Sequence, residues 1–189
     1  DGPASIQGFL DVATCVPGLL EEVARHPDVD AIVIACFDDT GLDAVRTLVS
    51  VPVLGIGEAA YHAASMIANK FSVITTLSRS VPGLENNLMR YGLAQKCVRV
   101  RATEIPVLKL EEGDPATLDN IRSEIRAAIE QDSAEAIVLG CAGMADLMAS
   151  LSDEFGLPVI DGVAAGVTFA EALVNNGLST SKIGAYSSN

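Results

Sequence analysis

The strongest constraint in this sequence is a pattern that occurs twice. Residues 30–36 read Asp-Ala-Ile-Val-Ile-Ala-Cys, and residues 135–141 read Glu-Ala-Ile-Val-Leu-Gly-Cys. In both copies a helix-like stretch follows, and then an apolar strand that contains Pro-Val, at residues 52–53 and 158–159. Strands rich in Val and Ile that alternate with helices predict a parallel sheet covered by helices on both faces. We therefore expect an α/β fold built from two related halves.

The rest of the sequence continues this alternation. In the second part of the chain, we predict strands at residues 70–76, 97–105, 135–140 and 157–160 and helices at 82–92, 115–131, 143–155 and 163–176. The first part repeats the later portion of that order, with helices at 16–25, 41–49 and 58–69 and strands at 30–35 and 52–56. Pro115 opens the clearest helix, in which Leu118, Ile121 and Ile125 share one face.

Aligning the two copies divides the chain into two pseudosymmetric α/β halves, each with a parallel central sheet. The first half comprises residues 1–69 together with 163–189, and the second comprises residues 70–162. Because the two repeated cysteines lie 105 residues apart, the first copy lacks about 35 residues that would match the opening strand, helix and strand of the second. The chain also begins with Asp1 rather than Met, so we predict that its natural N-terminus lies upstream; the alternative is that the copies are unequal.

Composition limits the function classes. A formal net charge of −13 disfavours nucleic acid and anionic membrane surfaces as partners, because both attract patches of Lys and Arg. The apolar runs have the length of strands and the first residues do not resemble a signal peptide, so we expect no membrane span and a cytoplasmic protein with reduced thiols. The four cysteines form no Cys-x-x-Cys motif and the two histidines do not cluster with them, so we expect no metal site.

Cys36 and Cys141 occupy equivalent places at the carboxyl ends of predicted strands, where open α/β sheets bind their ligands. Each stands directly before a predicted helix, whose N–H groups and dipole are expected to stabilise a thiolate. Two such groups on opposite sides of one carbon permit racemisation: one thiolate removes a proton, and the other thiol delivers a proton to the opposite face. No cofactor is needed where adjacent carbonyl or amide groups acidify that carbon. Cys15 and Cys97 are expected to be small buried apolar residues.

Acidic residues near these positions have expected roles of their own. A carboxylate beside a thiol opposes its ionisation, and Asp38 and Asp39 follow Cys36, so the two thiols are expected to differ in resting protonation. Asp39 or Thr40 is expected to cap the helix that follows them. Asp161 ends a strand and is expected to cap the next helix rather than to orient a substrate.

The order and spacing of these segments resemble the aspartate/glutamate racemase superfamily and, within it, the hydantoin and allantoin racemases. The resemblance covers essentially the whole chain and is carried by residues 2–6, 35–39, 53–59, 140–144 and 158–163. It implies two α/β halves with the active site in the cleft between them. It also implies cofactor-independent racemisation of 5-substituted hydantoins or allantoin with Cys36 and Cys141 as the two bases, a small-molecule substrate, and a homo-oligomer.

The resemblance further implies which residues hold the substrate. The turns after the two thiols match the family's substrate-holding turns, and Thr75 and Thr76 are the counterpart of an Asn-Thr segment that is absent from the first copy. The implied substrate-binding residues are Phe37, Asp38, Thr75, Thr76, Gly140, Ala142 and Gly143. Phe37 and Ala142 replace the Asn or Thr that commonly follows the cysteines of acidic amino-acid racemases, which argues against free aspartate or glutamate as the substrate.

Other functions stay open on the sequence. Maleate isomerase relatives use two cysteines with one as a nucleophile, and arylmalonate decarboxylase relatives rely on one thiol, so the same fold could support either reaction. A third possibility is a non-catalytic two-lobed module that binds a small molecule, although such a module has no need for matched thiols.

Overall fold

A computed structural model of the chain describes residues 2–112 and 114–187. Residues 1, 113, 188 and 189, which include both ends of the predicted first half, lie outside the described residues. The helices are α1 (Phe9–Arg25), α2 (Leu42–Leu48), α3 (Ile56–Ile67), η1 (Ser78–Ser80), α4 (Val81–Arg90), η2 (Val107–Glu112), α5 (Pro115–Asp132), η3 (Ala142–Leu147), α6 (Met148–Phe155) and α7 (Gly162–Asn175). The strands are β1 (Ile32–Ile34), β2 (Val53–Gly55), β3 (Phe71–Thr75), β4 (Cys97–Ala102), β5 (Ala136–Leu139) and β6 (Val159–Asp161).

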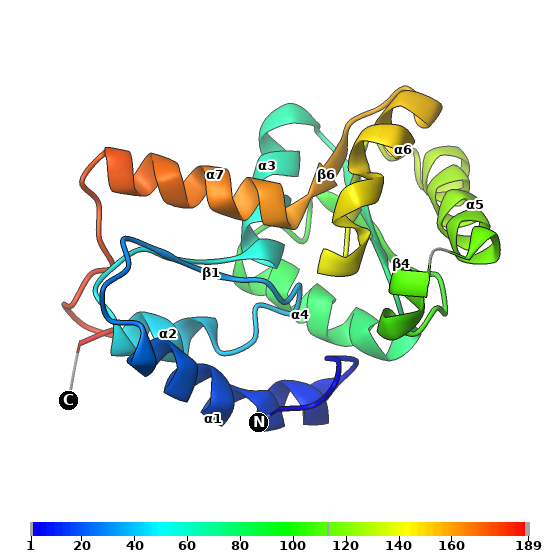
Figure 1. Ribbon diagram of the computed structural model, residues 1–189. Coiled ribbons are helices and arrows are strands. Elements are labelled where there is room, and N and C mark those ends of the chain that lie inside the picture. Colours follow the sequence, from blue (N-terminus) through cyan, green and yellow to red (C-terminus); the bar gives the residue numbers. More distant parts are fainter. Residues whose placement is uncertain (1, 113, 188–189) are drawn as a thin grey trace.

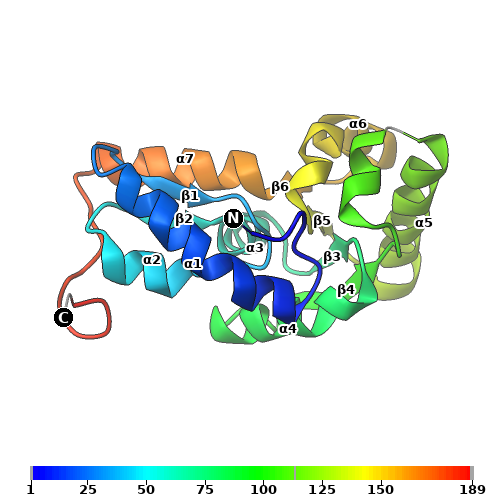
Figure 2. The same cartoon turned by 60° about the horizontal axis from the view of Figure 1, so that its bottom comes forward.

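In the described part of the chain, the strands form two parallel sheets. β1 pairs with β2, and the other strands take the order β4-β3-β5-β6. In Figures 1 and 2, β1 and β2 lie between α7 on one side and α1 and α2 on the other. In the larger sheet, α5 packs against β3 and β4, and α3 packs on the opposite face against β5 and β6. The predicted α/β fold with parallel sheets is confirmed.

The repeated sequence pattern becomes a repeated strand pairing. Ile32 lies opposite Val53 in the first copy, and Ile137 lies opposite Val159 in the second. In each copy, the cysteine stands two residues beyond the end of the first strand of the pair. The two cysteines therefore occupy equivalent positions, just past the carboxyl ends of equivalent strands.

α3 and α7 are the equivalent helices of the two copies, and they pack directly against each other. An added Cβ on Gly162, the first residue of α7, would lie 2.5 Å from the carbonyl oxygen of Ile56, the first residue of α3. Only glycine permits this approach between the two helix starts. Because α3 also contacts β2, β5 and β6, it joins the two sheets into one body, with its buried Tyr61 in a core cluster that extends to β3 and β5.

Most element boundaries differ from the predicted ones by one to three residues, and two elements differ by more. α1 begins at Phe9 rather than at residue 16, so Pro17 lies inside the helix instead of near its start. The predicted helix at 143–155 is a 3₁₀ helix, η3, followed by the short α-helix α6. α2 begins only at Leu42, and a turn separates it from Cys36. The division of the chain into two halves stays a prediction.

Two absences hold for residues 2–112 and 114–187. No helix there has the length and apolar character needed to cross a membrane. The same residues contain no group of three or more His, Cys, Asp or Glu side chains that could hold a metal ion.

The apolar cluster beneath α5 gives a test of the fold. Ile121 is fully buried there, so Ile121→Ala should lower the free energy of unfolding by about 2–5 kcal/mol, through lost apolar burial and the cavity left behind. Ile67, at the end of α3, is 61% exposed, and Ile67→Ala should change this free energy by no more than about 0.5 kcal/mol. Urea denaturation of both variants measures the difference, and equal losses would contradict the packing of α5 on the sheet.

Candidate active site

A cavity of about 180 Å³ lies where the carboxyl ends of β1, β3 and β5 come together. Its lining includes all nine residues that the sequence singled out: Cys36, Phe37, Asp38, Thr75, Thr76, Gly140, Cys141, Ala142 and Gly143. Cys36 comes from the turn after β1 and Cys141 from the turn after β5, so the two copies of the pattern each contribute one thiol to a common space. The chemical roles of these residues stay predictions.

The two thiols have matching local surroundings. Both are free and partly exposed. The Cys36 carbonyl accepts the N–H of Asp39 at 2.9 Å, and the Cys141 carbonyl accepts the N–H of Met144 at 3.1 Å, so the same tight turn follows each cysteine. The backbone N–H group two residues after each cysteine also bonds its sulfur, which favours the thiolate.

Burial disfavours the thiolate at both cysteines. It raises the pKa of Cys36 to about 11. The hydroxyl of Thr40, which lies 3.3 Å from the sulfur, lowers this pKa and so offsets part of the increase. Burial also raises the pKa of Cys141. The charge of Asp38 raises the pKa of both thiols further, and burial raises the pKa of Asp38 itself to about 6.

The predicted stabilisation of a thiolate by a helix start is wrong for Cys36, whereas at Cys141 the N–H of Gly143, in the first turn of η3, does bond the sulfur. Five residues separate Cys36 from α2, and Cys141 is followed by the 3₁₀ helix η3 rather than by an α-helix. At neither cysteine, therefore, does a helix start lower the thiol pKa enough to offset the increase caused by burial. Asp38 opposes ionisation, as predicted for a carboxylate beside a thiol, but it does so at both cysteines.

The capping predictions have a mixed outcome. Asp161 does cap the helix that follows it, because its carboxylate accepts the first N–H groups of α7. Asp39 does not cap α2; its carboxylate accepts the N–H groups of Gly57 at 2.9 Å and Glu58 at 2.7 Å, at the start of α3. Thr40 faces the sulfur of Cys36 instead of capping α2.

Several predicted binding residues also hold the frame of the cavity. The hydroxyl of Thr75 donates to the carbonyl of Gly140 at 3.2 Å and so ties the end of β3 to the segment that carries Cys141. An added Cβ on Gly140 would lie 3.0 Å from the Ile74 carbonyl oxygen, so a side chain here would require the end of β3 to shift by a few tenths of an ångström. Phe37 is almost fully buried, with its ring edge-on to Tyr61 at 5.3 Å between centroids.

Sequence reasoning missed four residues that line the cavity, namely Ile6, Ala35, Ser80 and Val107. Ser80 could have been found, because it lies in the segment after the carboxyl end of β3, and such segments form ligand sites in α/β sheets. Ile6 and Val107 lie in segments for which no helix or strand was predicted, and neither side chain carries a chemical signal.

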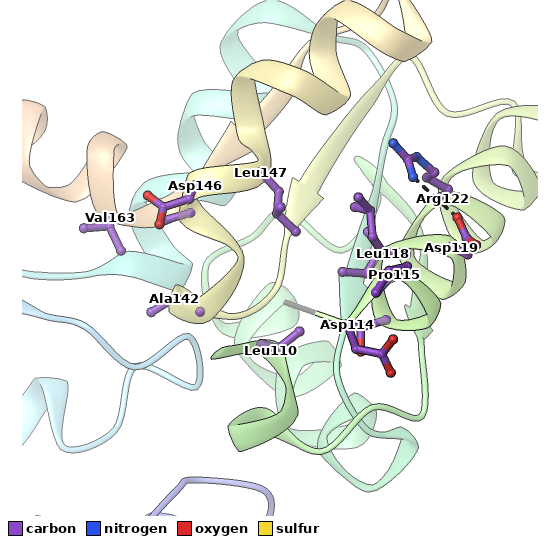
Figure 3. A pocket seen from close by; sticks show the side chains of 14 residues that line it. Leu110, Asp114, Pro115, Leu118, Asp119, Arg122, Ala142, Asp146, Leu147 and Val163 are labelled. Atoms are coloured by element: carbon purple, nitrogen blue, oxygen red, sulfur yellow. Dashed lines mark hydrogen bonds and ion pairs between the residues drawn. The ribbon is translucent and has the colours of Figure 1, made fainter. Parts of the chain in front are cut away.

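A larger cavity of about 770 Å³ adjoins the first (Figure 3). The two cavities share Ala142 and Gly143, the residues that follow Cys141. An added Cβ on Gly143 would lie 3.1 Å from Leu110 Cδ1 and 3.8 Å from the Cys141 sulfur, so this glycine lies between the thiol and the second cavity. The apolar lining of the larger cavity comes from Leu110, Pro115, Leu118, Ile121, Leu147 and Val163.

Comparison with known proteins decides the family. A family model described as Asp/Glu/Hydantoin racemase matches residues 1–170. The chain belongs to this family. It is 51% identical over 189 residues to a hydantoin racemase of Rhizobium meliloti, an alignment that covers 98% of this chain and 78% of that protein.

Solved structures agree with this assignment. An allantoin racemase from Klebsiella pneumoniae matches this racemase with a TM-score of 0.96 and 43% identity, over 100% of this chain and 78% of that one. An allantoin racemase from Pseudomonas fluorescens matches with a TM-score of 0.95 and 40% identity, over 100% of this chain and 81% of that one. The predicted resemblance is confirmed, and the protein is an isomerase of the racemase type with a small-molecule substrate.

The charge of Asp38 gives a test of the thiol electrostatics. Asp38→Asn should lower the pKa of Cys36 and of Cys141, because the carboxylate opposes both thiolates. Peptide mass spectrometry measures the rate at which iodoacetamide alkylates each cysteine. In the unchanged protein this rate should rise about tenfold per pH unit from about pH 7 to 9. In the variant, the curve of rate against pH should shift to lower pH. Asp153→Asn, on the exposed side of α6, removes the same charge and should leave both curves in place. Curves that do not move in Asp38→Asn would contradict the proposed influence of this carboxylate.

Proposed function

We propose that this racemase inverts the C5 centre of 5-substituted hydantoins, with Cys36 and Cys141 as its two acid/base groups. The observation that carries the proposal is the shared cavity, which both thiols line from equivalent turns of the two copies. The similarity to a hydantoin racemase supports the substrate class. The matched thiols support a two-base route, since each face of the ring then has its own proton carrier.

The reaction removes one proton from a carbon and returns another to its opposite face. C5 of a hydantoin lies beside a ring carbonyl, so the negative charge left by proton removal spreads onto the carbonyl oxygen. Cys36 or Cys141, as the thiolate, takes the C5 proton and becomes a thiol. The facing thiol then donates its proton to the other side of C5 and becomes a thiolate, so charge and protons balance and the two sulfurs exchange roles.

The raised thiol pKa values suit this chemistry. A thiolate that is costly to form is also a strong base, and a strong base is needed for a weakly acidic carbon. The backbone N–H group bonded to each sulfur reduces the cost of forming the thiolate without removing its basicity. Positioned acid and base groups of this kind each contribute about 10²–10⁴-fold to a rate.

The larger cavity offers room for the substituent on C5. It shares two small lining residues, Ala142 and Gly143, with the thiol cavity. Most of its lining side chains are apolar, as Figure 3 shows for Leu110, Leu118 and Leu147, while Asp114, Asp119, Arg122 and Asp146 also line it. We therefore favour hydantoins with an apolar C5 substituent over allantoin, whose ureido group is polar and hydrogen-bonding.

The other interpretations of the sequence predict observations other than loss of optical rotation. A covalent adduct on one sulfur would indicate chemistry like that of maleate isomerase, and release of carbon dioxide would indicate chemistry like that of arylmalonate decarboxylase. Independence from a cofactor, a homo-oligomeric assembly, the lack of nucleic-acid and membrane partners, and a cytoplasmic location stay predictions.

Single substitutions of the thiols test the two-base mechanism. Cys36→Ala and Cys141→Ala should each slow racemisation of one enantiomer of 5-benzylhydantoin by at least about 10²-fold, because each removes the proton carrier on one face. Polarimetry measures the loss of optical rotation, and NMR in D₂O measures deuterium entry at C5. Cys97→Ala, on β4 and outside this cavity, is the matched control and should retain the original rate. Undiminished turnover in the full chain carrying Cys36→Ala would contradict the mechanism.

Filling the larger cavity tests the substituent site. Leu147→Trp should lower kcat/KM for 5-benzylhydantoin about tenfold or more relative to that for 5-methylhydantoin, because the indole takes the space of the larger substituent. Leu10→Trp, at a 76% exposed position of α1, should leave the ratio of the two kcat/KM values unchanged. If Leu147→Trp affects both substrates equally, or if allantoin is turned over faster than either, the substituent lies elsewhere.

A further inference from the structure

The two copies of the repeated pattern cap their equivalent helices in different ways. In the second copy, Asp161 ends β6 and its carboxylate accepts the N–H groups of Val163 at 3.1 Å and Ala164 at 2.8 Å, in the first turn of α7. In the first copy, the residue that ends β2 and precedes α3 is Gly55, which has no side chain with which to cap. The corresponding N–H groups at the start of α3 must therefore be satisfied from elsewhere.

Asp39 supplies the missing carboxylate from a different segment. Its Oδ1 accepts the N–H of Gly57 at 2.9 Å and its Oδ2 accepts the N–H of Glu58 at 2.7 Å, the same helix positions that Asp161 serves in α7. An added Cβ on Gly55 would lie only 2.0 Å from Asp39 Oδ1. The carboxylate of Asp39 thus occupies the space that a capping side chain on residue 55 would need.

The two copies differ at both of the equivalent positions, the turn after the cysteine and the strand end before the helix. Asp39 and Met144 are equivalent residues, because each donates its N–H to the carbonyl of the cysteine three positions earlier. Met144 is fully buried in an apolar cluster, so the turn after Cys141 is held by packing. The first copy has an acid in this turn and a glycine at the strand end, whereas the second has an apolar residue in the turn and an acid at the strand end.

This arrangement ties the turn that carries Cys36 to α3. Asp39 adopts a left-handed backbone conformation with φ of 51°, which costs about 1 kcal/mol or more for a residue with a side chain and persists where the surroundings impose it. The hydroxyl of Tyr91, at the end of α4, also donates to Asp39 Oδ2 at 2.7 Å. The turn is thereby held between two helices by one carboxylate.

We propose that Asp39 is a positioning residue for Cys36, holding the turn that carries this thiol against the start of α3. The proposal rests on the proposed function in so far as it concerns turnover, since Cys36 must be one of the two acid/base groups. It assigns the two thiols different supports: a hydrogen-bonded anchor for Cys36 and an apolar anchor for Cys141.

A pair of variants separates this role from simple helix capping. Asp39→Gly removes both the cap and the tie to the turn, and glycine accepts the left-handed conformation at this position. The double variant Asp39→Gly/Gly55→Asp returns a capping carboxylate to α3 in the manner of Asp161, but leaves the turn free. We expect the thermal midpoint to fall in the single variant and to recover in the double variant.

Turnover and thiol reactivity should not recover with stability. In the double variant, racemisation should stay about tenfold to a hundredfold below the original rate, because the thiol is no longer held in place. The alkylation rate of Cys36 by iodoacetamide should change at least about threefold while that of Cys141 does not. Asp161→Gly is the matched control: it removes the cap of α7 and should lower the thermal midpoint without changing the alkylation ratio of the two cysteines.

Recovery of both turnover and the Cys36 alkylation rate in the double variant would overturn the proposal, because Asp39 would then act only as a cap. The alkylation readout does not depend on catalysis, so a failure of the two-base mechanism can be told apart from a failure of the positioning role. If the glycine variants do not fold, Asp39→Asn replaces them. It keeps one acceptor oxygen and should still alter the Cys36 alkylation rate alone, and an unchanged rate would overturn the proposal.

Discussion

The packing of α3 against α7 is the contact on which the rest of the structure depends. The two helices begin directly after β2 and β6, and Gly162 lets the start of α7 lie on the backbone of Ile56. A side chain at position 162 would force the helix starts apart, because close-packed backbone cannot yield by that much. With this contact in place, the strand ends of both copies open onto one cavity. The placement of the two thiols thus follows from a helix contact in which neither sulfur takes part.

Burial acts in two opposing ways on the candidate chemistry. It raises the pKa of both thiols and so disfavours the thiolate. The same exclusion of water strengthens the hydrogen bonds that each sulfur receives from the backbone and increases the basicity of the thiolate once it forms. The neighbouring carboxylate of Asp38 adds to the free-energy cost of forming either thiolate. Burial raises the pKa of Asp38 itself to about 6, so this charge is lost at lower pH. The thiol pKa values are therefore set mainly by burial and by the nearby carboxylate rather than by helix dipoles.

The sequence could predict that the two cysteines meet at one cavity, because the duplicated pattern marks both and places them at strand ends where α/β sheets bind ligands. Thr75 and Gly140, which line the same cavity, were expected there only from the family resemblance. The thiol pKa values could not be predicted, since they depend on desolvation by segments that meet only in the folded chain. The partner of Asp39 was missed for a similar reason: it lies 18 residues further on, and the nearest helix in sequence was taken as its partner. The sequence did contain one indication of this contact: Gly55 stands at a strand end where the other copy has Asp161, so the helix after Gly55 needs its cap from another segment.

Among the described residues, α7 is the last helix in sequence, yet it covers the β1-β2 sheet (Figure 1). During synthesis, all strands of the β4-β3-β5-β6 sheet have left the ribosome once residue 161 has emerged, whereas β1 and β2 must wait for residues 162–175. The later sheet can therefore form before the earlier one is covered on both faces. In a nascent chain that ends before α7, the face of β1 and β2 that this helix later covers stays exposed to solvent.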